Sequence, residues 1–255
     1  MRPELALLGG ILLLAVLTMP IYHAVAKRRG KDPLEVADRG TFILGRFLRE
    51  WFYWFVGPIE RTSLALGLPP IFWNIVGVVL GGVAGWAFAV SHFSIGGWAV
   101  LLGGVADVLD GRIARAQGVA SEQGAFLDST LDRFAEMGAF VGLAVRFGGS
   151  SAGLVWVTTA LGGSLLVSYA RARGESLGVV CKLGVMQRAE RLMLLGLAGI
   201  LDPGVSARWH PEWAESWGGA LLLPVLVLIA LGTVGTAIFR TWWIARRLPT
   251  VRSRG

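Results

Sequence analysis

Long apolar stretches alternate with short polar connections along the whole chain. Each apolar stretch approaches or exceeds the roughly 20 residues that a helix needs to cross the hydrocarbon core of a bilayer. Of all residues, 54% are hydrophobic and only 16% are charged, which lies outside the range of a soluble globular domain. The pattern predicts an all-α, polytopic integral membrane protein with seven spans. These are residues 5–26, 71–91, 95–116, 124–147, 152–169, 186–201 and 217–244.

The distribution of lysine and arginine predicts the orientation of the spans, because short cytoplasmic loops retain basic residues. If the N-terminus lies outside, the outer segments hold only Arg2, Arg146 and Arg208, and the inner segments hold the basic clusters. We therefore expect an outer N-terminus and a cytoplasmic C-terminus in the cell (inner) membrane. The net charge of +7 is spread along one membrane face. It favours anionic membrane lipids and phosphorylated substrates as partners over nucleic acid.

The first span has a second interpretation as a cleavable signal peptide, because Arg2, a short apolar run and the sequence AVA at 24–26 resemble one. Cleavage would leave Lys27, Arg28 and Arg29 at an exported end, against the charge pattern. A retained span is therefore favoured.

Residues 32–58, between the first two spans, contain the aromatic and basic stretch FILGRFLREWFYWFVGP. On a helix, its Phe and Trp side chains lie opposite Arg46, Arg49 and Glu50, which is typical of a helix in the membrane interface. A helix packed in the core is the alternative. The pair at 57–58, Gly-Pro, is expected to end this helix. The predicted division is an N-terminal span (1–30), an interfacial helix (31–59) and a catalytic membrane domain (60–255).

Cysteine and histidine chemistry is not indicated. Cys181 is the single cysteine, which excludes a disulfide framework and a thiolate metal site. His23, His92 and His210 are scattered near span ends, and they favour neither a metal site nor a catalytic triad.

Four aspartates lie near the facing ends of the third and fourth spans. Asp107 and Asp110 are three residues apart and Asp128 and Asp132 are four apart, so each pair shares one face of its helix. The short connection 117–123 makes the two helices antiparallel neighbours. The spacing therefore predicts that four carboxylates converge at one level of a helix bundle.

Four carboxylates in a membrane protein need compensating cations. Arg112, Arg115 and Arg133 supply part of that charge, so a structural cluster of ion pairs is one interpretation. A metal site is the favoured one, because oxygen ligands without Cys or His suit Mg²⁺ or Mn²⁺, and four carboxylates can hold two ions. Two such ions can clamp phosphate oxygens during displacement at phosphorus.

The stretch 107–132 reads D-x-x-D-G-x-x-A-R, then eight residues, then G-x-x-x-D-x-x-x-D, and it resembles the signature of the CDP-alcohol phosphotransferases. Every signature position is filled: Asp107, Asp110, Gly111, Ala114, Arg115, Gly124, Asp128 and Asp132. The resemblance implies a six-helix membrane core, with the first span outside it, and a site open to the cytoplasm. It also implies that an alcohol attacks the β-phosphorus of a CDP-linked lipid or alcohol and releases CMP.

The same resemblance implies roles for single residues. Four positions resemble metal ligands, namely Asp107, Asp110, Asp128 and Asp132. Asp132 also resembles the residue that takes the proton from the attacking hydroxyl. Asp107, Gly111 and Arg115 resemble positions that face the CDP group. Family members often carry P-N-x-x-T before the signature, and in the matching stretch PIFWN the amide of Asn74 would replace the hydroxyl as a CDP contact.

A basic connection, residues 168–194, joins the fifth and sixth spans. Its basic side chains suit the oxygens of a second phosphate, so a phosphorylated alcohol is the expected acceptor. A basic loop without a ligand is the alternative. The pattern S-Y-x-R-A-R, followed by glycine and a form of E-R-x-E-R in which Gln187 replaces the first glutamate, resembles the phosphatidylinositol phosphate and archaetidylinositol phosphate synthases. The candidate ligands of the acceptor phosphate are Arg171, Lys182, Arg188 and Arg191.

That branch implies inositol 1-phosphate as acceptor and CDP-diacylglycerol or its ether analogue as donor. Glycerol 3-phosphate stays open as an acceptor, as do serine and free inositol, which need no second basic site. From another class, an ion-coupled transporter also places carboxylates in a membrane. A homodimer is common in the resembling family, and the glycine-rich stretch 77–85 offers packing faces either for it or for contacts within the chain.

Overall fold

The computed structural model describes residues 3–28, 45–209 and 219–248, and every regular element within them is a helix. In chain order these are α1 (Pro3–Arg28), α3 (Gly45–Ala65), α4 (Pro70–Ala89), α5 (Phe93–Ala116), α6 (Glu122–Phe147), α7 (Ser151–Ser176), α8 (Arg188–Trp209) and α10 (Leu222–Ala245). Each predicted span coincides with one helix, so the all-α membrane architecture is confirmed.

The helices differ in how well they suit a membrane. By length and composition, α4, α5, α7 and α10 are apolar enough to cross one. The helices α6 and α8 are long enough but carry charged residues, including Asp128 and Asp132 in α6 and Arg188 and Arg191 in α8. The count of seven spans therefore stays a prediction.

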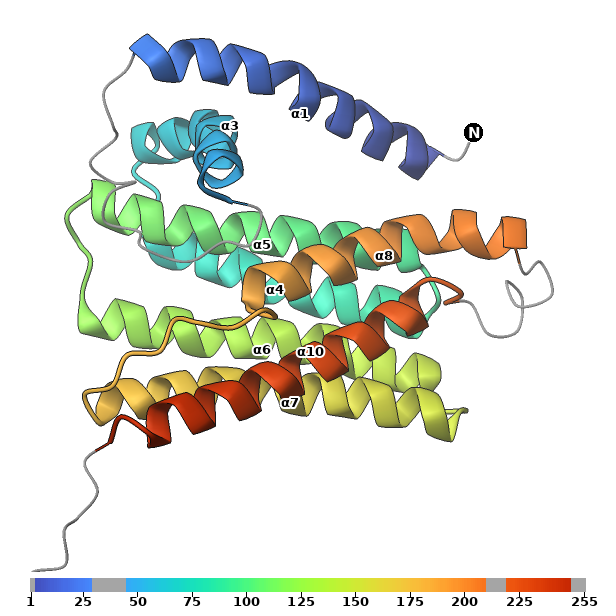
Figure 1. Ribbon diagram of the computed structural model, residues 1–255. Coiled ribbons are helices and arrows are strands. Elements are labelled where there is room, and N and C mark those ends of the chain that lie inside the picture. The colour runs from blue at the N-terminus through green and yellow to red at the C-terminus, as the bar shows by residue number, and fades with distance from the viewer. Residues whose placement is uncertain (1–2, 29–44, 210–218, 249–255) are drawn as a thin grey trace, which may run out of the picture.

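The bundle is layered, with α1 and α3 on one side and α7 and α10 on the other (Figure 1). Between these layers, α4 packs closely on both α5 and α6, and α5 packs on α8. The core is formed by apolar side chains with little or no exposure, among them Phe88, Leu143, Leu195, Leu226 and Ile229. Within a bilayer these side chains stabilise the bundle through van der Waals packing, because lipid tails are as apolar as the side chains themselves.

Glycines set the distance between α4 and α6. A Cβ added at Gly85 would collide with the backbone of Gly138, and one at Gly142 would collide with the backbone of Gly85. A Cβ at Gly81 would collide with Ala135 in the same way. Two of the glycines in the stretch 77–85 are therefore used for packing within the chain, and the predicted homodimer is left untested.

The expected relation of α5 to α6 needs a correction. The connection between them is short, with Gly118 in the left-handed region at φ 69°, and Ser121 Oγ accepts a bond from the Gly124 N–H at 3.1 Å. However, α5 and α6 contact each other little, because α4 packs against both of them. They approach each other closely only near this turn, where the aspartates lie.

The predicted end of the interfacial helix at Gly57 and Pro58 is wrong. Helix α3 continues through both residues to Ala65, although Pro58 cannot donate a backbone hydrogen bond. Val56, Glu60 and Ser63 are buried on both sides of the proline, so tertiary contacts hold the helix together there. The proposed boundary at 59/60 falls inside α3, and residues 32–44 of the predicted helix lie outside the described residues.

Candidate metal and nucleotide site

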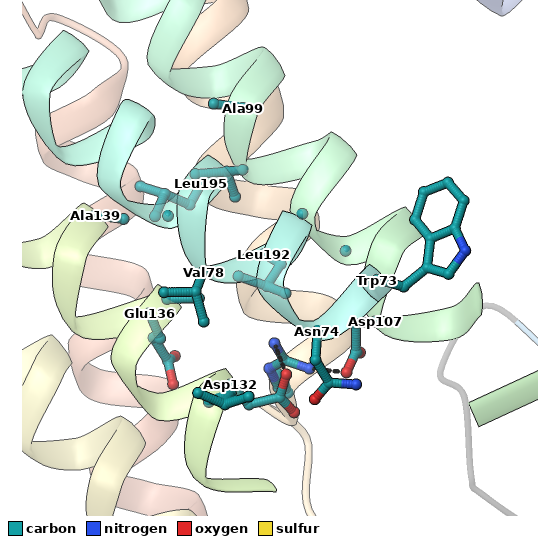
Figure 2. A pocket seen from close by; sticks show the side chains of 18 of the residues that line it. Trp73, Asn74, Val78, Ala99, Asp107, Asp132, Glu136, Ala139, Leu192 and Leu195 are labelled. Carbon is teal, nitrogen blue, oxygen red and sulfur yellow. Dashed lines mark ion pairs between the residues drawn. The ribbon is translucent and has the colours of Figure 1, made fainter. Parts of the chain in front are cut away.

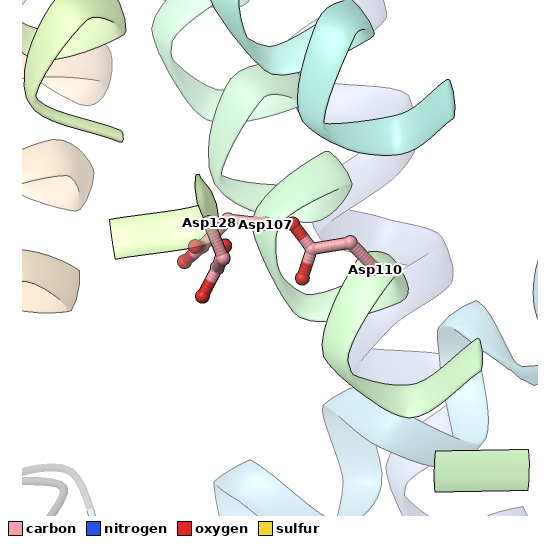
Figure 3. Close-up of side chains that lie close together, drawn as sticks. All are labelled: Asp107, Asp110 and Asp128. Carbon is pink, nitrogen blue, oxygen red and sulfur yellow. The ribbon is translucent and has the colours of Figure 1, made fainter. Parts of the chain in front are cut away.

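Three of the four aspartates come together where α5 ends and α6 begins. Asp107, Asp110 and Asp128 each offer one carboxylate oxygen, and these oxygens lie within 4.8 Å of one another (Figure 3). The three-residue spacing on α5 places Asp107 and Asp110 on one face, and the short turn brings the first turns of α6 to the same level.

These carboxylates fit a divalent metal ion. Asp110 is buried, and Asp128 Oδ1 is buried with no hydrogen-bond donor near it. A buried carboxylate oxygen without a partner is costly, and oxygen-only ligands favour hard cations. The donor set and the unpartnered oxygen of Asp128 therefore suit binding of a divalent cation.

Asp132 lies one turn beyond Asp128 and is joined to the cluster by an arginine. Arg188 Nη2 lies 2.7 Å from Asp132 Oδ1, and Arg188 Nη1 pairs with Asp107. A weaker pair joins Arg133 Nη1 to Asp132 Oδ2 at 3.6 Å. Asp132 is thus adjacent to the three-carboxylate group, and it shares Arg188 with that group.

A small cavity of about 30 Å³, roughly the volume of one water molecule, extends from the acidic cluster into the bundle. Figure 2 shows Asn74, Asp107 and Asp132 at the same end of this cavity. Apolar residues line the other end, where Figure 2 shows Ala99, Ala139 and Leu195. The polar side chains of the cluster therefore lie at the boundary between a polar opening and an apolar interior.

A larger pocket of about 400 Å³ lies on the outer side of the cluster. It is lined by Asn74, Gly111 and Arg115, three of the four positions predicted to face CDP, together with Asp110 and Asp128. The fourth, Asp107, lines the smaller cavity instead. Six of the eight signature positions thus border this pocket, which is large enough for part of a nucleotide.

Asn74 has a further role that the motif comparison does not suggest. Its Nδ2 donates to Asp110 Oδ2 at 2.7 Å. This bond holds the carboxylate of Asp110 toward α4. Asn74 therefore orients a candidate metal ligand in addition to lining the pocket.

The predicted ligands of the acceptor phosphate differ in their burial and in their partners. Arg171 is exposed and pairs with Glu175 at 2.9 Å, and Lys182 is exposed in the connection before α8. Arg188 lies in the acidic cluster. Arg191 is only 2% exposed, and its Nε and Nη2 donate to Glu136 at 3.0 and 3.3 Å. Their role in binding phosphate stays a prediction.

Two buried charged residues near the site were missed in the sequence. Glu136 lies four residues after Asp132 and continues the row of acidic positions on α6, a spacing that could have revealed it. Arg240 on α10 is buried and donates to Leu183 O at 2.8 Å and Val167 O at 3.0 Å. It anchors the basic connection against α10, and no signal in the sequence distinguishes it from the other basic residues at the C-terminal end.

Comparison with known proteins identifies the family of this chain. The family model of CDP-alcohol phosphatidyltransferases matches residues 62–214. The archaetidylinositol phosphate synthase of Methanothermobacter thermautotrophicus is 34% identical over 194 residues, which cover 76% of this chain and 90% of that protein. The phosphatidylinositol phosphate synthase of Mycobacteroides abscessus is 34% identical over 190 residues, covering 73% and 85%.

A solved structure is also similar. The crystal structure of Mycobacterium tuberculosis phosphatidylinositol phosphate synthase with CDP-DAG bound has a TM-score of 0.62 and 27% identity, and it covers 78% of this chain and 96% of that one. The family assignment makes this protein a transferase of the membrane, and the expected resemblance is confirmed. This chain belongs to the CDP-alcohol phosphatidyltransferase family.

Proposed function

We propose that this protein transfers a phosphatidyl-type group from CDP-diacylglycerol, or its ether analogue, to inositol 1-phosphate and releases CMP. The observation that carries the proposal is the convergence of Asp107, Asp110 and Asp128 beside a pocket lined by the signature residues Gly111, Ala114, Arg115 and Gly124. The curated relatives named above are phosphatidylinositol phosphate and archaetidylinositol phosphate synthases, which supports inositol phosphate as acceptor.

In the proposed reaction, the acceptor hydroxyl oxygen forms a bond to the β-phosphorus of the CDP-lipid. The bond from that phosphorus to the oxygen bridging the two phosphates breaks, and CMP leaves with this oxygen. Asp132 takes the hydroxyl proton, because it lies beside the cluster but outside its tight three-carboxylate group. Arg188, between Asp107 and Asp132, is placed to orient both carboxylates.

Two divalent ions, Mg²⁺ or Mn²⁺, are proposed as cofactors, with Asp107, Asp110, Asp128 and Asp132 as ligands. When bound, such ions neutralise charge on the phosphate oxygens during displacement. Asn74 holds Asp110 in place for this role, and Gly111 leaves the floor of the pocket free of a side chain. Arg115 is exposed at the same pocket and is placed to pair with a phosphate of CDP.

The acceptor phosphate is proposed to bind at the basic connection, with Lys182 and Arg171 at its surface and Arg188 at its inner end. The site is proposed to open to the cytoplasm from the inner membrane, with the N-terminus outside, because the basic residues gather at this end of the bundle. We also propose that two copies of this chain form a homodimer.

The test is CMP release by the purified protein in detergent with CDP-diacylglycerol and Mg²⁺ or Mn²⁺. Inositol 1-phosphate, glycerol 3-phosphate, free inositol and serine are compared as acceptors. Release that requires metal and inositol 1-phosphate is expected. CMP release with glycerol 3-phosphate alone would show that glycerol 3-phosphate, and not inositol 1-phosphate, is the acceptor of the same reaction. No CMP release with any acceptor would contradict the proposed function.

A further inference from the structure

A buried ion pair joins α3 to the helix that carries the first two aspartates. Arg112 Nε donates to Glu60 Oε2 at 2.6 Å, and the exposed fractions of the two residues are 6% and 7%. The guanidinium also lies over the ring of Tyr53, 4.9 Å from its centroid. The pair therefore lies in an enclosed setting formed by two helices that are distant in the sequence.

Arg112 stands inside the signature but faces away from the carboxylates. Two residues along a helix correspond to a rotation of about 200°, so the side chain of Arg112 leaves α5 on the side opposite Asp110. On that side, Leu109 and Ile113 pack with Val56 of α3 in an apolar cluster. The ion pair is embedded in this cluster, and none of its atoms lines the nucleotide pocket.

Two further bonds tie the chain that follows α3 to the same part of α5. Gln117 Nε2 donates to Leu68 O at 2.9 Å, and Asn74 donates to Asp110 at 2.7 Å. The segment held by these bonds contains Pro70 and Ile71, which line the nucleotide pocket opposite the end of α5 and the start of α6. Helix α3 thus adjoins this wall of the pocket through the short connection 66–69, and both α3 and α4 pack on α5.

A buried ion pair is a poor source of net stability, because apolar side chains of similar volume would pack there without the cost of removing two charges from water. Its value lies in geometry, since a charge-assisted hydrogen bond restricts the distance and the relative orientation of the two groups. The Glu60–Arg112 pair is therefore better explained as a contact that fixes the position of α3 on α5 than as a contact that stabilises the fold.

We propose that Glu60 is a positioning residue for the CDP-lipid site: through Arg112 it fixes α3, and with it the wall formed by Pro70, Ile71 and Asn74, against the signature helix. The inference rests on the proposed function, since it concerns the nucleotide pocket of that reaction. It assigns a role to α3, which lies mostly before the segment matched by the family model.

The first test is Glu60→Gln in the full-length protein, reconstituted in nanodiscs. The expected result is a KM for CDP-diacylglycerol raised about tenfold, while the KM for the acceptor changes less than about twofold. Arg61→Gln is the matched control, because Arg61 is the next residue of α3 and is exposed, with its Nε bonded only locally to Gly57 O at 3.3 Å. An unchanged KM for CDP-diacylglycerol in Glu60→Gln would overturn the inference.

The double variant Glu60→Leu/Arg112→Leu separates positioning from stability. It should unfold at a temperature close to that of the wild type and still show the raised KM for CDP-diacylglycerol. A KM for CDP-diacylglycerol equal to that of the wild type in this double variant would show that apolar packing positions α3 without the ion pair. That result would overturn the inference. If Glu60→Gln does not fold, the KM of the double variant for CDP-diacylglycerol tests the inference in its place.

Direct titration with CDP-diacylglycerol distinguishes failure of the inference from failure of the proposed function. If the wild type binds the lipid without releasing CMP, the proposed reaction fails, and weaker binding by Glu60→Gln still supports the positioning role. Equal binding by wild type and variant overturns it. A wild type that neither binds the lipid nor releases CMP overturns both.

Discussion

At the scale of single residues, the site combines carboxylates of different environments. Asp110 has a fixed partner in Asn74, Asp107 and Asp132 share Arg188, and Asp128 Oδ1 is buried without a donor. Asp128 is thus the carboxylate whose environment depends most on a bound cation. The other aspartates retain protein partners without one.

Replacing Asp128 by Asn should abolish metal-dependent CMP release with every acceptor, because the amide removes the charge that the unpartnered oxygen offers to a cation. Activity is measured with saturating Mn²⁺ and Mg²⁺. Ser129→Ala is the neighbouring control, since Ser129 Oγ donates only to Phe126 O within its own helix at 3.0 Å. Full activity in Asp128→Asn would contradict the metal-site assignment.

The basic connection provides a second prediction at this scale, because Lys182 and Arg191 differ in burial. Arg191→Ala leaves the carboxylate of Glu136 buried and unpaired, so stability should fall by roughly 3–5 kcal/mol. Lys182→Ala should leave the unfolding temperature unchanged and raise the KM for inositol 1-phosphate. Thermal unfolding in detergent and steady-state kinetics measure the two effects. If Arg191→Ala instead kept its stability and raised the KM for inositol 1-phosphate, Arg191 would be shown to face the acceptor.

At the scale of elements, the close approach of α4 to α6 explains how α5 and α6 present their aspartates together. Gly85 and Gly142 meet backbone to backbone, which leaves no room for a side chain between the two helices. Since α4 also carries Asn74, the same contact places the partner of Asp110. The glycine-lined interface between α4 and α6 therefore influences the position of the candidate metal ligands.

Gly142→Ala should lower both stability and activity, because the added methyl group would overlap the backbone of Gly85 and force α4 away from α6. The expected loss of stability is about 1–3 kcal/mol, measured by thermal unfolding in detergent. Gly82→Ala on the neighbouring face of α4 is the control, because a Cβ there meets nothing within 4 Å. Equal stability and equal activity of Gly142→Ala and Gly82→Ala would contradict the close packing of α4 on α6.

At the scale of the whole molecule, the acidic cluster joins two helices that otherwise contact each other little. A cation bound by carboxylates of both α5 and α6 would link the half of the bundle containing α5 and α8 to the half containing α6, α7 and α10. Ligands that bind only the folded protein raise its stability. The metal site is therefore expected to act on the stability of the entire bundle.

Addition of Mn²⁺ or Mg²⁺ to metal-free protein should raise its unfolding temperature, and chelation should reverse the change. At about 100 times the dissociation constant the gain is about 2.7 kcal/mol. The measurement is thermal unfolding with and without chelator, for the wild type and for Asp128→Asn. An equal shift in the variant would show that the ions bind elsewhere.

The sequence by itself determined the positions of the span-length helices and the acidic character of the site. Apolar runs of span length are local information, and spacings of three and four residues place Asp107 with Asp110 and Asp128 with Asp132 whatever the rest of the chain does. The fixed spacing of the signature was sufficient to indicate the family and to identify three aspartates that do converge.

Only the tertiary structure decided which charged groups meet across helices. Arg191 pairs with Glu136, 55 residues away, and Arg112 with Glu60, 52 residues away. No local spacing predicts such pairs, because they depend on the relative rotation and separation of packed helices. For the same reason the sequence did not reveal α4 packed against both α5 and α6, nor the continuation of α3 through Pro58, which its buried contacts with α5 maintain.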